Sequence, residues 1–215
     1  AAVYRHHGGE TADARRDRRA AAEIERRLPA DDKGDRHFLG ALGLPGGNVM
    51  ADIAHWLVRY KKVERVTAIA RRGPLERKYD SKEIRAVCSN MDREGLTKEF
   101  ARIKDRLTAV GQNADEVFKG LTDEFTKCEQ TVSETKMGFK FLASPKRILV
   151  DENNRVRGLE MEDNKLDPKG QDTVAVGMKQ YYEFPCDSVV FAVGDKVDET
   201  VGLPYKRGLF VTNPN

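Results

Sequence analysis

Cysteine and histidine are scarce in this sequence, and their spacing excludes the simplest metal and thiol sites. The three cysteines lie far apart and form no Cys-x-x-Cys pair: Cys88, Cys128 and Cys186. The pattern indicates neither a zinc knuckle nor a redox disulfide, so we expect free thiols that pack as small apolar side chains. His6, His7 and His37 show no ligand spacing to one another or to a carboxylate, so no metal site is predicted.

Long apolar runs and a strong excess of one charge are also missing. No apolar stretch approaches the length of a membrane span, and the first residues lack the apolar core of a secretory signal. The 38 basic and 35 acidic residues leave a net charge of +3, which argues against a nucleic-acid surface or a polybasic membrane anchor. We therefore expect a cytoplasmic protein, and its apolar content of 39% suffices for a globular core.

Residues 1–38 differ in composition from the rest of the chain. Arginine, alanine and acidic residues dominate this segment, and a helix over 12–28 would have only a narrow apolar face. We therefore divide the chain into an atypical N-terminal segment at 1–38, expected to be marginally helical or disordered, and a nucleotide-binding domain at 39–215.

The next part of the chain has the pattern of a strand, a glycine turn, a helix and a second strand. An apolar run at 38–42 precedes the sequence GGN at 46–48, and apolar residues then recur at helical spacing over 49–60. The run VERVTAIA at 63–70 is typical of a buried parallel strand. Such a βαβ unit leaves free backbone N–H groups at the positive start of its helix, where a dinucleotide pyrophosphate binds.

Arg71 and Arg72 directly follow the second strand and supply another anion site. Arginine forms bidentate, charge-assisted bonds to phosphate oxygens and keeps its charge. Arginines at this place in a βαβ unit bind the adenosine 2′-phosphate of NADP, whereas an NAD site would favour a carboxylate. The spacing therefore predicts a preference for NADPH over NADH.

After the arginines the pattern changes from helices to strands. Residues 81–128 are charged and mostly helical, with breaks expected near Gly111 and Gly120. Two of the strands that follow form a hairpin around an Asn-containing turn. A polar loop is expected at 167–172. The predicted strands lie at 138–145, 146–151, 155–163, within 173–184, and at 187–193.

Four segments in this order resemble a known family. They are GGNVMADIAHWL, VTAIARRGPLERKYDSKEIR, FKFLASPKRILVDENNRVRGLEMEDNKL and DSVVFAVGDKVDE. Residues 47–215 resemble the NADPH-binding domain of adrenodoxin-type ferredoxin–NADP reductases and of glutamate-synthase small-subunit-like flavoproteins. Together with the strand pattern, the resemblance implies a Rossmann-like α/β domain of three layers: helices, a parallel sheet and an antiparallel β-meander.

The resemblance implies an FAD-dependent NAD(P)H oxidoreductase. In such enzymes a hydride passes from NADPH to FAD, and electrons continue to a ferredoxin or another iron–sulfur protein or subunit. The FAD-binding segments that flank this domain in the family are not evident here, so the chain is expected to be an inactive fragment when isolated. The alternative is a non-catalytic dinucleotide-binding or interaction module that lacks the FAD half.

The resemblance assigns nucleotide contacts to seven residues and a catalytic role to none: Gly46, Gly47, Asn48, Val49, Arg71, Arg72 and Glu83. The first four form the pyrophosphate turn, the arginines form the 2′-phosphate pair, and Glu83 is a carboxylate that touches the nucleotide. The alternative for Gly47 and Asn48 is that they only begin a helix, for which both residues are common. The alternative for the arginines is a solvent-exposed basic surface with no ligand. Asp80 and Glu83 also match a capping box, in which Glu83 has a structural role.

The turn departs from the family pattern at one position. Pro45 stands where the family has the first glycine of Gly-x-Gly-Asn-Val. Proline fixes φ at about −65° and lacks an N–H group, so it neither adopts the glycine turn nor donates to a phosphate. We therefore expect weakened pyrophosphate binding.

The remaining candidates have simple structural interpretations. We expect His55 and Trp56, in the helix at 49–60, to be packing residues. A catalytic role for His55 is not needed, because transfer of a hydride to a flavin needs no protein acid. The basic residues of the hairpin would suit an acidic redox partner, although the solvent face of a sheet often has this composition: Lys146, Arg147, Arg155 and Arg157.

Overall fold

The computed structural model describes most of the chain from residue 37 onward. The described residues are 37–42, 48–60, 63–77, 79–129, 133–170, 172–192, 202, 204–206 and 209–210. Outside them lie the segment up to residue 36, the turn residues Pro45, Gly46 and Gly47, and residues 193–201. The expected disorder of the N-terminal segment and the expected effect of Pro45 therefore stay predictions.

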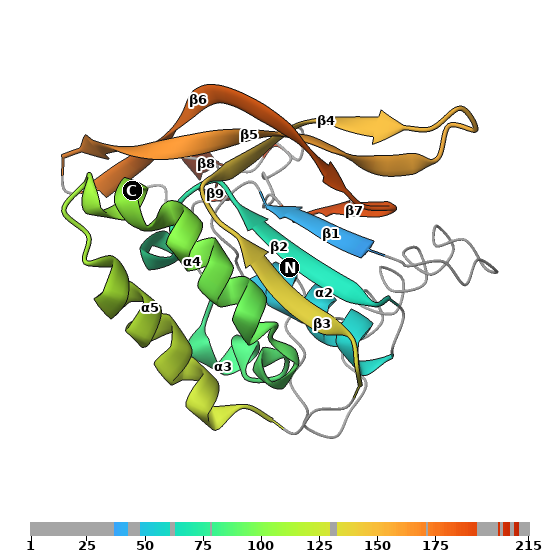
Figure 1. Ribbon diagram of the computed structural model, residues 1–215, viewed down its shortest axis with the longest axis horizontal. Helices are drawn as coiled ribbons and strands as arrows, with labels where there is room; N and C mark the ends of the chain where they lie inside the picture. Colours follow the sequence, from blue (N-terminus) through green and yellow to red (C-terminus); the bar gives the residue numbers. More distant parts are fainter. Residues whose placement is uncertain are drawn as a thin grey trace.

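A four-stranded parallel sheet lies at the centre of the fold (Figure 1). Its strands, in the order β3-β2-β1-β7, are β3 (Lys136–Lys140), β2 (Arg65–Ala70), β1 (His37–Leu42) and β7 (Ser188–Phe191). Ala41 of β1 pairs with Ile69 of β2 on one side and with Phe191 of β7 on the other. This order matches the first four strands of a dinucleotide-binding sheet, with its switch point between β1 and β7.

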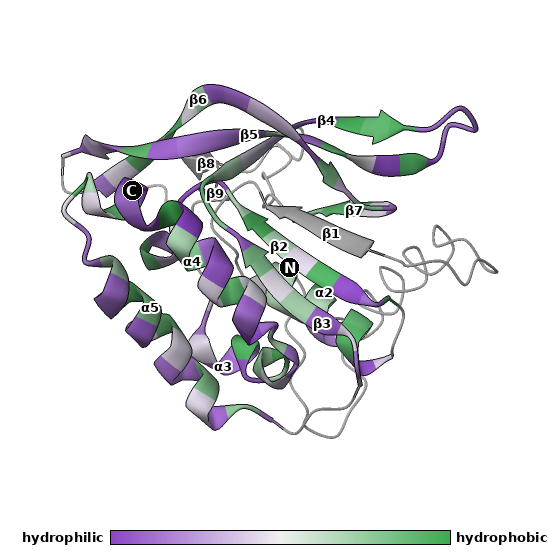
Figure 2. Cartoon of the chain, in the orientation of Figure 1, coloured by the Kyte–Doolittle hydropathy of each residue, from purple (hydrophilic) through white to green (hydrophobic). Residues whose placement is uncertain are grey.

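Helices cover one face of the parallel sheet. The longer ones are α2 (Asn48–Arg59), α4 (Arg93–Thr108) and α5 (Ala114–Asp123), and the short ones are η1 (Pro74–Glu76), α3 (Ser81–Ile84), η2 (Cys88–Asn90) and η3 (Glu124–Lys127). Val66, Ala68 and Ala70 of β2 belong to the apolar core that these helices share. Figure 2 shows hydrophilic and hydrophobic residues alternating along α4 and α5, as in amphipathic helices. None of the described helices is long and apolar enough to cross a membrane.

An antiparallel β-meander covers the opposite face. Its strands, in the order β4-β5-β6, are β4 (Ala143–Val150), β5 (Val156–Lys169) and β6 (Asp172–Pro185). Ile69, which alternates with the helix-facing residues of β2, belongs to a second apolar cluster that includes Ala143, Leu159, Met161 and Cys186. The predicted α/β fold is therefore confirmed, with the parallel sheet between the helices and the meander (Figure 1).

A network of ion pairs and hydrogen bonds joins α4 to the segment after β3 and to the middle of β5. The buried carboxylate of Glu99 accepts hydrogen bonds from Arg102 Nη2 at 2.6 Å and from the Phe141 backbone N–H at 2.7 Å. Asp163 accepts from Arg102 Nη1 and from Arg106 Nη2, each at 2.9 Å. The network fixes the helical layer against the meander at the sheet edge where β3 ends.

Three expectations about local structure are corrected. Gly111, at φ 79°, ends the region of α4 as predicted, but Gly120 lies inside α5 without a break. The predicted strand at 138–145 is divided at Leu142, whose φ of 49° separates β3 from β4. The predicted polar loop at 167–172 is mostly strand, because the β5–β6 ladder continues to the pair Lys169 and Asp172.

Cys88 and Cys128 form a disulfide, so the expectation of free thiols is wrong for these two residues. They are separated by 40 residues in the sequence, and their Cα atoms lie 5.5 Å apart. Packing of the segment after η3 against the end of α3 brings them together, since the Glu129 backbone N–H donates to the Arg85 carbonyl at 2.9 Å. Cys186 is a buried free thiol, and burial raises its pKa to about 12.

Candidate functional site

The carboxyl ends of β1, β2 and β7 meet at one edge of the parallel sheet. They end nearly level, because Ala41 pairs with both Ile69 and Phe191 near the ends of these strands. The chain leaves β1 for α2 on the helical face, whereas it reaches β7 from the meander on the other face. The edge between β1 and β7 is therefore the kind of crevice in which open α/β sheets bind ligands.

Helix α2 begins at Asn48, one residue before the start that the sequence pattern predicted. Asn48 and Val49 lie in its first turn, where the backbone N–H groups have no partner within the helix. The first turn contains no acidic residue, and Arg59 lies in the last turn. The absence of an acidic residue suits an anion at the start of α2, where the helix dipole is positive, and Arg59 interacts favourably with the negative end of the dipole.

Arg71 and Arg72 follow β2 directly, and the meander holds their backbone in place. The Arg71 carbonyl accepts a hydrogen bond from Asn164 Nδ2 at 2.9 Å, and the Arg72 carbonyl accepts one from the Leu142 backbone N–H at 3.2 Å. Asn164 is buried, and its Nδ2 also donates to Ser144 Oγ at 2.8 Å. The two carbonyls are thus fixed while the Arg71 residue stays exposed to solvent.

The Arg72 guanidinium lies against the tip of the β5–β6 hairpin. Its Nη1 is 3.3 Å from Asp172 Oδ1 and 3.3 Å from the Thr173 carbonyl oxygen. The Arg72 side chain is 15% exposed, whereas that of Asp172 is 74% exposed. Sequence reasoning missed Asp172, because it is a hundred residues away from Arg72 and was assigned to a loop without a defined position.

Glu76 joins this hairpin tip to the helical layer. Its Oε1 accepts hydrogen bonds from Thr173 Oγ1 at 2.8 Å and from Gln112 Nε2 at 2.7 Å. A Cβ atom at Gly73 would lie 2.9 Å from Glu76 Oε2 and 3.0 Å from Leu107 Cδ2, so glycine permits the close approach of these segments. The segment after β2, the α4–α5 connection and β6 therefore meet beside Arg72.

Glu83 lies on α3, and its described interactions are with α2 and α3. Its Oε1 is 3.9 Å from Lys82 Nζ. Burial lowers the pKa of His55 on α2, and the charges of Glu129 and Glu83 oppose that shift. Among the described residues, no hydrogen bond or ion pair joins Glu83 to either arginine. Asp80 is the N-cap of α3, but its side chain makes no capping hydrogen bond. The hydrogen bond that Asp80 would supply to a capping box is therefore missing.

The basic residues of the meander form ion pairs with carboxylates across the strands. Arg147 Nη2 lies 3.1 Å from Glu160 Oε1, and Arg157 Nη1 lies 2.8 Å from Glu183 Oε2. Lys146 pairs with Glu162 in the same way. These pairs favour the simpler interpretation of an ordinary solvent-facing sheet surface.

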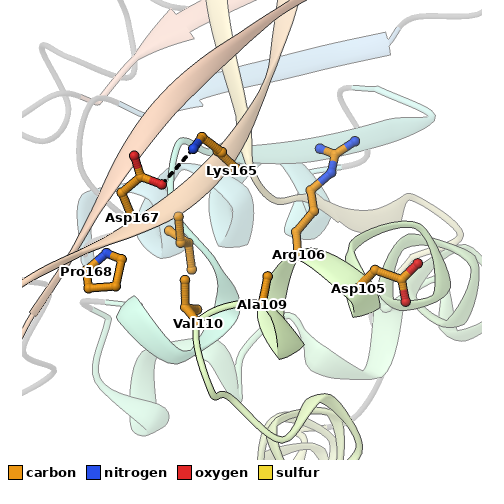
Figure 3. A pocket seen from close by; sticks show the side chains of 8 residues that line it. Asp105, Arg106, Ala109, Val110, Lys165, Asp167 and Pro168 are labelled. Carbon is orange, nitrogen blue, oxygen red and sulfur yellow. Dashed lines mark ion pairs between the residues drawn. The ribbon is translucent and has the colours of Figure 1, made fainter.

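A hollow of about 390 Å³ lies between the end of α4 and β5 (Figure 3). Its lining includes the ion pair of Lys165 and Asp167, 2.9 Å apart, and Arg106, which already binds Asp163 and the Asn164 carbonyl. It contains none of the residues that the sequence predicts for the site. Within the described ranges, no group of three or more residues is arranged to hold a metal ion.

Comparison with known proteins agrees with the resemblance seen in the sequence. No protein-family model matches the chain. The chain is 23% identical over 173 residues to NADPH:adrenodoxin oxidoreductase of Rattus norvegicus, covering 74% of this chain and 35% of the relative. It is 28% identical over 169 residues to NADPH-ferredoxin reductase FprA of Mycobacterium tuberculosis, covering 73% of this chain and 34% of the relative. The chain thus spans about a third of the length of these relatives.

Solved structures of Mycobacterium tuberculosis FprA share the fold. The complex of FprA with NADPH has a TM-score of 0.57 and 23% identity, covering 84% of this chain and 44% of that one. An FprA structure with covalently modified NADP+ has a TM-score of 0.55 and 22% identity, covering 80% of this chain and 42% of that one. The predicted resemblance is therefore confirmed: over about three quarters of its length this chain is similar to adrenodoxin-type ferredoxin–NADP reductases, and it has their α/β nucleotide-binding fold.

Proposed function

We propose that this chain is the NADPH-binding part of an FAD-dependent oxidoreductase. The observation that carries the proposal is the arginine pair, Arg71 and Arg72, at the carboxyl end of β2 beside the switch point of the sheet. The related proteins are named for NADPH and for ferredoxin-type partners. By that analogy the electron acceptor is a ferredoxin or another iron–sulfur protein. The cytoplasmic location expected from the sequence stays a prediction.

The residues at the sheet edge suit the chemical groups of NADPH. The start of α2, with Gly46, Gly47, Asn48 and Val49, would hold the pyrophosphate through backbone N–H groups. The arginine pair would hold the 2′-phosphate, and its fixed backbone carbonyls limit the positions that the guanidinium groups can reach. Glu83 would touch the nucleotide from α3.

The protein's contribution to the reaction is positioning. Bound NADPH supplies a hydride for reduction of FAD, and the reactivity belongs to the cofactors. The sheet edge and the start of α2 orient the nucleotide by its phosphates, and the arginine pair selects the 2′-phosphorylated form.

Substitution of both arginines tests the proposal. Loss of one charge-assisted bond costs about 1.5 to 3 kcal/mol, which is roughly a ten- to hundredfold change in affinity. The double variant Arg71→Ala with Arg72→Ala should therefore lose the preference for NADPH and bind NADH as the unmutated chain does. Isothermal titration calorimetry measures the dissociation constants of both nucleotides for the double variant and for the unmutated chain.

Arg147→Ala serves as the matched control, because it removes an arginine of the meander that pairs with Glu160. This control should keep the preference for NADPH. Unchanged NADPH binding in the double variant would contradict the assigned roles of Arg71 and Arg72.

A further inference from the structure

We propose that the carboxylate of Asp172 is an internal competitor of the nucleotide 2′-phosphate for Arg72. This inference rests on the proposed function, because it assumes that Arg72 receives that phosphate. It gives the tip of the β5–β6 hairpin a role in setting the affinity and the specificity of the site.

The geometry around Arg72 resembles that of an anion site with a carboxylate in place of the phosphate. Asp172 Oδ1 lies 3.3 Å from Arg72 Nη1 and also accepts a hydrogen bond from the Thr173 backbone N–H at 2.8 Å. The second bond orients the carboxylate at the start of β6. The same Arg72 nitrogen donates to the Thr173 carbonyl, so the hairpin presents two acceptors to this guanidinium.

The hairpin tip is anchored independently of this ion pair. Thr173 Oγ1 donates to Glu76 Oε1 at 2.8 Å, and the ladder of β5 and β6 continues to the pair Lys169 and Asp172. Asp172 therefore stays near Arg72 when their ion pair breaks. Its side chain is 74% exposed, so it can rotate into solvent while the hairpin stays in place.

The competition has a predictable sign. A phosphate that approaches Arg72 must displace the carboxylate, and it also meets the negative charge that remains nearby. An ion pair with one largely exposed partner, as Asp172 is here, is worth a factor of up to about five in an equilibrium constant. Removal of the Asp172 charge should therefore tighten binding of a 2′-phosphorylated ligand by about two- to fivefold, and salt should reduce the effect.

Asp172→Asn tests the proposal with little change in shape. The asparagine keeps an oxygen that can accept from the Thr173 N–H, and it removes the charge. Asp172→Ser is a second variant with the same expected direction, in case the amide side chain perturbs the turn. Asp167→Asn is the matched control, because it neutralises a carboxylate of the same hairpin that pairs with Lys165.

The measurement is calorimetric titration of the full chain with 2′,5′-ADP and with 5′-AMP, at low and at high salt. We expect both Asp172 variants to bind 2′,5′-ADP about two- to fivefold more tightly at low salt, with 5′-AMP and the Asp167 variant unchanged. Thermal unfolding of each variant verifies that it is folded.

Three outcomes would overturn the inference in distinguishable ways. If the unmutated chain and the Asp172 variants bind 2′,5′-ADP with equal affinity, Asp172 does not compete with the phosphate. The proposed function is not affected by that result. If the Asp167 variant binds 2′,5′-ADP more tightly by the same factor as the Asp172 variants, the effect comes from the overall charge of the hairpin. That result rejects the specific role of Asp172. Failure of every variant and of the unmutated chain to bind 2′,5′-ADP rejects the proposed function together with this inference.

Discussion

At the scale of single residues, the site depends on the groups that hold the arginine pair as well as on the arginines themselves. Asn164 is buried and reaches across from β5 to the Arg71 carbonyl and to Ser144 Oγ. A buried amide with such partners leaves unsatisfied groups when it is removed. The sequence around the arginines contains no sign of this support, because Asn164 lies in another layer of the fold.

Asn164→Ala should lower the free energy of unfolding by about 1 to 3 kcal/mol, because the Arg71 carbonyl loses its described donor. It should also weaken binding of 2′,5′-ADP, since the backbone beneath the arginines is less constrained. Urea unfolding and calorimetry measure the two effects. Asn153→Ala, in the exposed turn between β4 and β5, is the control that should change neither quantity. If the Asn164 variant were as stable as the unmutated chain, the structural role assigned to the Asn164 side chain would be wrong.

At the scale of elements, local sequence patterns predicted the parts of the fold whose pattern is complete within a short window. The helix at 49–60 and the strand at 63–70 appear as α2 and β2, because one-sided and continuous apolar patterns fix them locally. The division at Leu142 and the length of β5 and β6 were not predicted, since they depend on pairing with distant strands.

The same limit applies to the site. Local motifs predicted the place of Arg72 at the end of a buried strand, but its contact with Asp172 arises only when the meander folds over the sheet. The disulfide between Cys88 and Cys128 was missed for a similar reason, because packing of two separate segments creates it. Contacts between segments that are distant in the sequence therefore account for most of what the sequence did not predict.

The start of α4 supplies a prediction about one element. Asp92 is its N-cap: its Oδ1 accepts from the Gly95 backbone N–H at 2.9 Å, and its Oδ2 lies 2.8 Å from Arg65 Nη1. The Gly95 hydrogen bond holds the pKa of Asp92 below its usual value, although burial opposes the shift, and Arg65 contributes in the same direction as Gly95. Asp92→Ala should therefore lower the free energy of unfolding by about 0.5 to 2 kcal/mol at neutral pH.

The pH dependence of this effect has a defined sign. A carboxyl group with a lowered pKa in the folded state stabilises the fold above its unfolded pKa of about 3.9, and the contribution is lost as pH falls through the folded pKa. The stability difference between the unmutated chain and Asp92→Ala should therefore shrink on acidification. Urea midpoints at neutral and at acid pH measure it, with Asp92→Asn as a control that keeps the cap without the charge. A difference that stays constant with pH would contradict the argument.

At the scale of the whole molecule, all three layers contribute to the proposed nucleotide site. The parallel sheet has its switch point between β1 and β7, the helical layer supplies the start of α2, and the meander fixes the segment after β2. Each layer thus contributes something that the others do not. We expect one nucleotide to bind per chain, at the edge where the layers meet.

The ratio of the Kd for NADH to the Kd for NADPH, measured by calorimetry on the unmutated chain at low salt, tests the central claim most directly. The account predicts one NADPH per chain and a ratio of about ten to a hundred, because NADH lacks the 2′-phosphate that the arginine pair is proposed to hold. Equal dissociation constants for the two nucleotides would contradict it.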